Sequence, residues 1–169
     1  MSAPPGLRGT LAALALATGA VLAVSVAGAV QDSGPDRSQD IAWMNRQQAY
    51  LGELRAEDGW QAMSGGLKWR RVAGDGTGAR PSVDDTVTVH YAGRFIDGQT
   101  FDSSYDRGEP ATFPLNRLVK AWQIAIPQMG EGDTIEIAAP ADLAYGPQGK
   151  GPIPGGATLL FTVELLDIE

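Results

Sequence analysis

The sequence predicts an α+β domain in which an antiparallel sheet of about five strands wraps around one short helix. Two observations predict this class. From Leu67 onward, apolar and polar residues alternate as they do in strands that bury one face. A single segment, 118–126, instead carries apolar residues at helical spacing and stops before Pro127. An apolar N-terminal segment and a second helical pattern precede this domain.

The strands follow from the alternation and from the turns between them. Residues 86–91 put Val87, Val89 and Tyr91 on one face. Asp97-Gly98 is a strong hairpin signal. We expect strands at 67–72, 86–91, 100–103, 134–138 and 158–168.

The short helix lies between the third and fourth of these strands. Asn116 is a suitable N-cap, because its side chain can accept a hydrogen bond from a backbone N–H of the first turn. The helix that it would cap contains Leu118, Val119 and Trp122, and extends toward Ile126.

The first thirty residues predict export from the cytoplasm. Arg8 is the only charge before Asp32, and residues 11–30 are an apolar run broken only by small residues. With the small-x-small site at 27–29, this pattern predicts a secretory signal peptide. An uncleaved anchor is the alternative, because about 20 apolar residues cross a bilayer. We therefore expect a periplasmic protein, or one anchored in the inner membrane through residues 1–30 with its domain facing the periplasm.

Residues 31–64 form a linker and an N-terminal helix. The linker, 31–40, is rich in polar and turn-forming residues. Ser38 is the expected N-cap of a helix that ends near Gly59. Its apolar stripe consists of Ile41, Met44, Leu51 and Leu54, together with Gln48. We expect this helix to pack on the domain or to act as a spacer, with dimerisation as the alternative. The main domain, 65–169, should fold and keep most activity in a fragment starting near Met63.

Composition excludes several classes of protein. The net charge of −7 argues against non-specific nucleic-acid binding, which depends on clustered Lys and Arg. The absence of cysteine excludes disulfides, thiolate metal sites, a catalytic thiol and a lipid-modified cysteine anchor. We expect neither a metal nor a cofactor.

Six aromatic residues in separate segments are candidates for one small apolar pocket. Asp102 is the one carboxylate placed among them. A pocket with no nucleophile and no metal ligands suits a reaction that breaks no covalent bond, such as rotation about a peptide bond. Each ring taken alone is more often a core residue. The six are Tyr91, Phe101, Phe113, Trp122, Tyr145 and Phe161.

Two other chemistries are disfavoured. A hydrolase using Ser103 or Ser104 with His90 lacks the strand–elbow–helix context of a nucleophilic serine. We expect His90 to be structural. The glycine-rich stretch 74–78 lacks the Lys-Ser/Thr of a phosphate-binding loop, so it is expected to be a turn.

Several motifs recur in a characteristic order. They are VHYAG at 89–93, TFDSS at 100–104, Trp122 followed by QM at 128–129, DLAYG at 142–146, IP at 153–154 and ATLLF at 157–161. In this order and spacing they resemble the FKBP-type peptidyl-prolyl isomerases over residues 65–169.

The resemblance implies a role for each pocket position. Trp122 would form the floor, and the walls would be Tyr91, Phe101, Phe113 and Phe161. Leu118 and Val119 would form the aliphatic rim, and Ile153 would lie on the closing loop. Asp102 and Tyr145 would be the polar groups at the edge, acting with Tyr91 in catalysis.

The chain also departs from the family pattern. Ala121 stands where many members have Gly, the loop 147–155 is shorter than in the best-known small members, and Lys150 replaces a His at its tip. The resemblance implies proline-containing polypeptides as substrates and a macrolide as a further ligand. The loop changes bear on macrolide affinity more than on activity.

The sequence therefore predicts a peptidyl-prolyl cis-trans isomerase that accelerates X-Pro rotation in proteins folding outside the cytoplasm. An apolar pocket would favour the twisted, less polar amide by desolvation and positioning, with no covalent intermediate. The alternative is a non-catalytic chaperone or assembly module that uses the same pocket for docking and the 41–58 helix for contacts.

Overall fold

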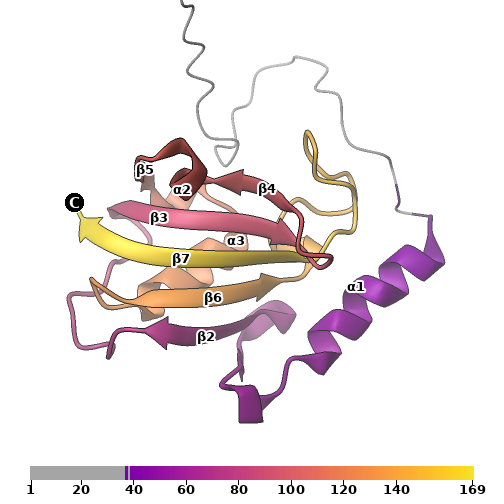
Figure 1. The fold of residues 1–169 in the computed structure, drawn as a ribbon, viewed down its shortest axis with the longest axis horizontal. Helices are drawn as coiled ribbons and strands as arrows, with labels where there is room; N and C mark the ends of the chain where they lie inside the picture. The colour runs from indigo at the N-terminus through magenta and orange to yellow at the C-terminus, as the bar shows by residue number, and fades with distance from the viewer. Residues whose placement is uncertain (1–36, 38) are drawn as a thin grey trace, which may run out of the picture.

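A single antiparallel sheet organises the structure, a computed structural model that describes residues 37 and 39–169. Among these described residues, seven strands form the sheet in the order β1-β2-β6-β7-β3-β4, with β5 also paired to β3. Figure 1 shows β3, β7 and β6 side by side at its centre. The strands are β1 (Gln61–Ala62), β2 (Lys68–Ala73), β3 (Thr86–Phe95), β4 (Thr100–Ser103), β5 (Ala111–Pro114), β6 (Thr134–Ala139) and β7 (Leu159–Ile168).

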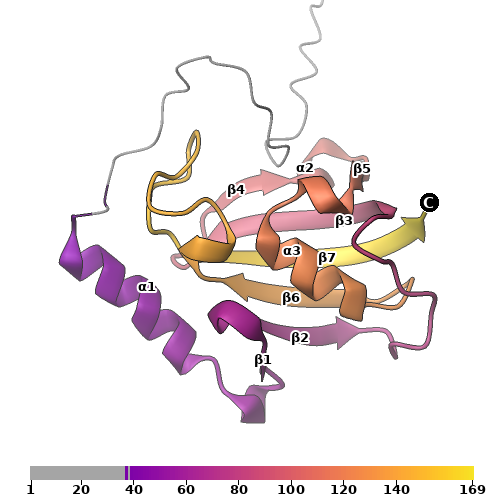
Figure 2. The same ribbon diagram turned by 180° about the vertical axis from the view of Figure 1, so that it is seen from behind.

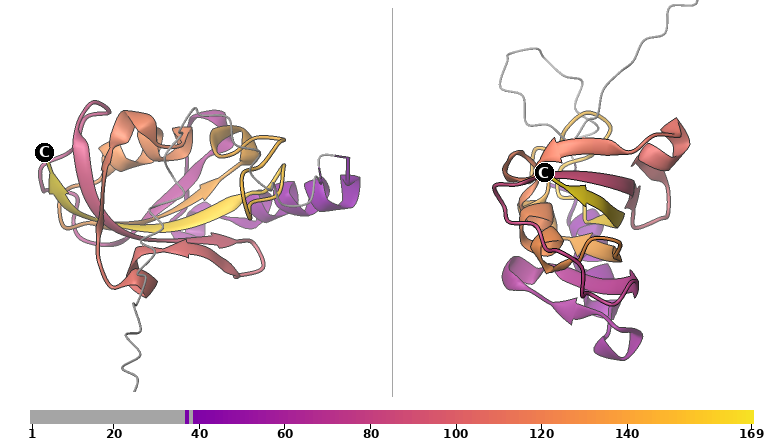
Figure 3. Two further views of the ribbon diagram at one scale, coloured as in Figure 1. Left: turned by 90° about the horizontal axis from the view of Figure 1, so that it is seen from above. Right: turned by 90° about the vertical axis from the view of Figure 1, so that its left-hand side faces the viewer.

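Three α-helices accompany the sheet in the part of the chain that the structure describes. They are α1 (Ile41–Glu53), α2 (Ser104–Arg107) and α3 (Lys120–Ala125). Figure 2 shows α3 lying across one face of the sheet, whereas α1 lies beyond one end of it, as the left-hand view of Figure 3 also shows. Short 3-10 turns occupy Ala56–Asp58, Ser64–Gly66, Leu115–Arg117, Ile126–Gln128 and Ala141–Leu143. The predicted α+β class is confirmed.

The core lies between α3 and the sheet face that it covers. Alternate residues of β3 are fully buried, as the period of two predicted. Strand β7 buries a matching row, and each such side chain contributes on the order of 1.5–3 kcal/mol when removed from water. The two rows are Val87, Val89 and Tyr91 on β3, and Leu159, Phe161, Val163 and Leu165 on β7.

The strand count exceeds the expected five because of two short elements. Strand β1 has only two residues, and β5 has four, ending at Pro114. Neither is long enough to show an alternating pattern, so both are defined by their partners: β1 pairs with β2 and β5 with β3.

The start of α3 corrects one prediction. Asn116 does not cap it: this residue lies in a 3-10 turn, and α3 begins at Lys120 after Val119, which makes no side-chain capping bond. Leu118 is extended, Val119 is also not helical, and both are buried. Packing of these two side chains into the core outweighs the local preference for a capped helix.

Helix α1 begins where an aspartate caps it. The Asp40 carboxylate accepts a 2.9 Å hydrogen bond from the Trp43 backbone N–H. Ser38, the expected cap, lies outside the described residues, as does the predicted leader at 1–30. Within residues 37 and 39–169, no helix is long and apolar enough to span a membrane.

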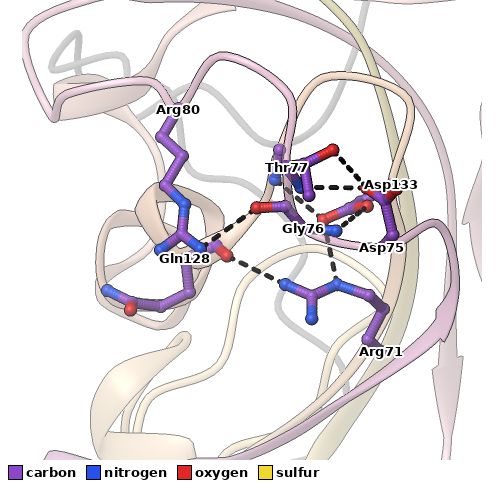
Figure 4. A network of polar contacts seen from close by, with 8 residues as sticks. Arg71, Asp75, Gly76, Thr77, Arg80, Gln128 and Asp133 are labelled. Atoms are coloured by element: carbon purple, nitrogen blue, oxygen red, sulfur yellow. Dashed lines mark hydrogen bonds and ion pairs between the residues drawn. The ribbon is translucent and has the colours of Figure 1, made fainter.

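The glycine-rich stretch 74–78 is a loop fixed by one buried carboxylate (Figure 4). Asp133 accepts hydrogen bonds from Arg71 Nε at 2.9 Å and from the backbone N–H groups of Gly76 at 3.0 Å and Gly130 at 2.8 Å. Its side chain is 3% exposed. These bonds join the β2–β3 connection to the start of β6, and the turn predicted here is confirmed.

Candidate functional site

The fold brings five of the predicted aromatic residues into one cluster. Tyr91 comes from β3, Phe101 from β4, Phe113 from β5, Trp122 from α3 and Phe161 from β7. Their rings meet largely edge to face, the arrangement that the charge distribution of aromatic rings favours. The Trp122 ring centroid lies 5.4 Å from that of Tyr91 and 5.5 Å from that of Phe161. Phe101 lies 6.0 Å from Phe161, and Tyr91 lies 6.3 Å from Phe113.

Burial divides this cluster into a floor and an edge. Trp122 and Tyr91 are fully buried, while Phe101 and Tyr145 are only partly buried and pack against the buried core. Trp122 Nε1 is buried without a hydrogen-bond partner among the described residues. A buried donor left unsatisfied costs stability, so this position is not optimised for stability alone.

The polar edge contains a residue that sequence analysis missed. Tyr91 Oη donates a 2.6 Å hydrogen bond to Asp102 Oδ2. Arg107 donates to the other oxygen of Asp102 and, through Nη2, to Tyr91 Oη at 2.9 Å. Arg107 is carried by α2, which Ser103 caps through the Asp106 N–H. The sequence could have indicated this helical turn only through Ser103, its N-cap. The direction of the turn, which brings Arg107 to Asp102, is seen only in the structure.

This environment keeps the two phenols protonated. Burial, followed by the hydrogen bond to Asp102, raises the pKa of Tyr91 to about 12. Burial also raises the pKa of Tyr145, and the nearby charge of Asp102 adds to that shift. Burial opposes ionisation of Arg107, but its bonds to Tyr91 and Asp102 outweigh this and raise its pKa. At neutral pH the edge therefore holds two protonated phenols beside a paired carboxylate and guanidinium.

The aliphatic rim lies in the same apolar cluster. Leu118, Val119 and Ile153 are all buried there. Ile153 belongs to the loop 147–155, which closes on itself: the Lys150 N–H donates to Ile153 O at 2.9 Å, and the Ile153 N–H donates to Lys150 O at 3.0 Å. The structure thus brings together all ten residues that the sequence proposed for the site.

Comparison with known proteins agrees with this arrangement. The sequence model of the FKBP-type peptidyl-prolyl cis-trans isomerase family matches residues 78–166, more than half of the chain. The chain belongs to this family.

Several relatives of this FKBP-type chain are known. It is 46% identical over 120 residues to the FKBP-type peptidyl-prolyl cis-trans isomerase FkpA of Aeromonas hydrophila, covering 71% of this chain and 44% of that protein. It is 40% identical over 122 residues to the outer membrane protein MIP of Legionella longbeachae, covering 72% and 52%. The chain spans about half the length of these relatives.

Solved structures show the same fold. The crystal structure of FkpA from Escherichia coli matches with a TM-score of 0.73 at 38% identity, covering 78% of this chain and 62% of that one. A peptidyl-prolyl cis-trans isomerase from Pseudomonas syringae matches with a TM-score of 0.70 at 29% identity, covering 76% and 94%.

Helix α1 of this FKBP-type chain holds the stem of the 147–155 loop. Trp43 Nε1 donates to Gly155 O at 3.2 Å. Gln47 is only 2% exposed. Its side-chain Oε1 accepts a hydrogen bond from the Thr158 backbone N–H at 2.8 Å, and its backbone carbonyl accepts one from the Thr158 hydroxyl at 3.3 Å. The sequence predicted packing for this helix, but it gave no sign that the contact would be with the segment beside Ile153.

The geometry around His90 explains why it is structural. Its Nδ1 lies 3.0 Å from Ser104 Oγ, within the reach of a nucleophile–base pair. Ser104 is fully buried, and its hydroxyl bonds both the N–H and the C=O of Tyr91, so no substrate reaches it. The His90 ring stacks on Tyr105 with centroids 4.7 Å apart. The pair therefore fixes β3 to α2.

Proposed function

We propose that this chain catalyses cis-trans isomerisation of X-Pro bonds in polypeptides that fold outside the cytoplasm. The observation that carries the proposal is the buried aromatic floor of Trp122, Tyr91 and Phe161 beside the hydrogen-bonded Tyr91–Asp102–Arg107 edge. Membership of the FKBP-type family supports it.

The reaction needs no bond to break. Amide resonance imposes a rotation barrier of about 18–20 kcal/mol, and X-Pro bonds exchange over tens to hundreds of seconds. The planar amide is more polar than the twisted one, so an apolar enclosure favours the twisted state. Each 1.4 kcal/mol or so of differential stabilisation accelerates rotation about tenfold. The aromatic cluster supplies the enclosure and packs the proline ring.

The polar edge has a positioning role in this mechanism. Asp102 and Arg107 fix the Tyr91 hydroxyl from both sides, so Asp102 acts by orienting Tyr91. The Tyr145 phenol, kept protonated by burial, donates to the substrate carbonyl. No group in this scheme gains or loses a proton during rotation.

Location outside the cytoplasm is the second part of the proposal. The apolar run at 11–30 and the single preceding Arg8 support export. A relative described as an outer membrane protein supports it as well.

A protease-coupled assay tests the catalytic part. Residues 31–169 should accelerate the cis-to-trans step of an X-Pro tetrapeptide in proportion to enzyme concentration. The Trp122→Ala variant should lose that acceleration. A cooperatively folded protein that gives no acceleration, yet still binds unfolded polypeptide, would replace this proposal with the non-catalytic docking role.

A further inference from the structure

A cavity of about 530 Å³ lies where the first turn of α1 faces the domain. The residues after β3 form one side, and the loop 147–155 forms another. Its apolar lining comes from Trp43, Phe95, Ile96, Pro152 and Pro154. None of the residues assigned to the aromatic site lines it, so it is a separate feature of the surface.

This cavity adjoins the aromatic site at two points. The Phe95 ring, which lines the cavity, lies 5.0 Å from the ring of Phe101, which belongs to the site. Pro152 and Pro154 line the cavity and flank Ile153, which belongs to the site's rim. A polypeptide held in the aromatic site would therefore have the cavity beside it.

The cavity carries two arginines in a chain whose net charge is −7. The Arg37 guanidinium lies 4.7 Å over the Trp43 ring, and Arg46 is exposed on the same helix as Trp43. Neither forms an ion pair with another residue of the described chain. Asp97 also lines the cavity, but its Oδ1 already accepts the Gln99 backbone N–H at 2.9 Å.

We propose that this cavity is a second binding site for the substrate polypeptide, taking an extended segment next to the isomerised proline. An apolar side chain of that segment would pack on Trp43 and Phe95, and an acidic side chain would pair with Arg37 and Arg46. This rests on the proposed function, because it assigns the flanking sequence of the same substrate. Two observations favour this occupant over a second copy of the chain: the cavity adjoins the aromatic site, and neither arginine forms an ion pair with another described residue.

A charge-swap experiment on the full chain tests the proposal. Peptides share one X-Pro core and carry two Glu, two Gln or two Lys residues on either the N-terminal or the C-terminal side. When the flanking residues lie on the side of the proline that reaches the cavity, wild-type protein should show a KM about two- to fivefold lower for the Glu peptide than for the Gln peptide. This is the range expected of partly exposed ion pairs. The difference should fade at high salt.

The double variant Arg37→Glu and Arg46→Glu should invert the preference, favouring the Lys peptide, with kcat for an unflanked tetrapeptide unchanged. Arg55→Glu is the matched control, because Arg55 is exposed, lies away from the cavity and pairs with Glu57. The second site is overturned if wild-type protein shows no difference in KM between the Glu and Gln peptides. It is also overturned if the double variant keeps the wild-type difference. Absence of activity on the unflanked tetrapeptide would overturn the proposed function itself.

Discussion

Tyr91 illustrates how one residue joins the core to the site. Its ring is buried against Trp122, while its hydroxyl reaches the edge and lies between Asp102 and Arg107. A hydroxyl held from two sides loses little freedom when substrate binds, which is the advantage of preorganisation. The pocket residues should therefore fall into two classes when they are mutated, those that enclose and those that orient.

The enclosing and orienting classes are separable by experiment. Trp122→Ala should destabilise the fold by about 3–5 kcal/mol, because it empties a fully buried ring site. Tyr145→Phe removes one hydroxyl and should leave stability nearly unchanged while lowering kcat/KM by about one to two powers of ten. Chemical denaturation and the coupled assay measure the two effects. Unchanged kcat/KM in Tyr145→Phe would remove Tyr145 from the proposed mechanism.

The dependence of kcat/KM on pH should be flat across the neutral range, because no group in the proposed mechanism gains or loses a proton. Stability should instead depend on pH in the alkaline range. The pKa of Tyr91 is raised to about 12, so its phenol stays protonated in the folded state where a solvated tyrosine would ionise near 10. The neutral phenol is thus favoured by folding. Its contribution to stability is complete below about pH 10 and is lost as pH rises from about 10 to 12. The coupled assay between pH 6 and 9 tests the flat activity profile, and denaturation at alkaline pH tests the loss of stability.

His90→Ala supplies the control for this prediction. Its stacking on Tyr105 and its bond to Ser104 are structural, so the variant should lose some stability and keep its activity. A bell-shaped rate profile centred near the ordinary pKa of histidine, or an inactive but well-folded variant, would indicate acid–base chemistry instead.

At the scale of elements, α1 acts on the site through the 147–155 loop. Gln47→Ala removes the acceptor of the buried Thr158 N–H and should cost about 1–3 kcal/mol. Because the loop that carries Ile153 would lose an anchor, KM for a short X-Pro peptide should rise while kcat changes little. Gln48→Ala is the matched control, since Gln48 is the exposed neighbour on the same helix.

A fragment beginning near Met63 extends this test. Residues 1–58 supply no pocket position, so the sequence predicts that this fragment folds and keeps most activity. With both the Trp43 and the Gln47 anchors removed, we expect a folded fragment whose KM is raised at least as much as that of Gln47→Ala. A fragment with the KM of the full chain would show that α1 does not position the loop.

The connection between β2 and β3 depends on Asp133 in a similar way. Three donors converge on its carboxylate; burial alone would raise the pKa of Asp133, but the bonds from Gly130, Gly76 and Arg71 lower it overall. Its contribution to stability is present above the pKa of an unfolded aspartate, near 4, and is lost as pH falls below that value. Asp133→Ala should cost about 3 kcal/mol, because Arg71 and two backbone donors lose their partner.

Urea denaturation at pH 7 and at pH 3 measures this effect. The variant should lose less stability on acidification than wild type does. Asp75→Ala is the control, since Asp75 is exposed and its carboxylate accepts hydrogen bonds from Thr77, two residues later. Equal costs for the two variants would contradict a special role for Asp133.

At the scale of the whole molecule, the predicted export places the catalytic domain outside the cytoplasmic membrane. A reporter fused after Glu169 should be active only if it is of a type that works in the periplasm. Deleting residues 11–30 should keep the same fusion inside the cell. Activity confined to a reporter that works only in the cytoplasm would contradict the export prediction.

Much of the fold and the site was determined by local patterns in the sequence. The period of two placed Tyr91 and Phe161 on buried faces, because side chains alternate across a strand whatever the strand pairs with. The resemblance to the FKBP-type family, carried by the order of the motifs, then related Asp102 and Tyr145 to the same site. The structure places Asp102 against Tyr91, and Tyr145 against the buried core.

Only the tertiary structure decided the contacts that join distant segments. Gln47 meets Thr158 across 111 residues, and nothing near either residue indicates the other. Arg107, on the helical turn α2 after β4, meets the Tyr91 hydroxyl of β3 across 16 residues. Asp133 accepts a hydrogen bond from the backbone of Gly76, 57 residues earlier. Hydrogen bonds of this kind depend on where elements pack, and packing is a property of the whole chain, whereas strand and helix periods depend on a few adjacent residues.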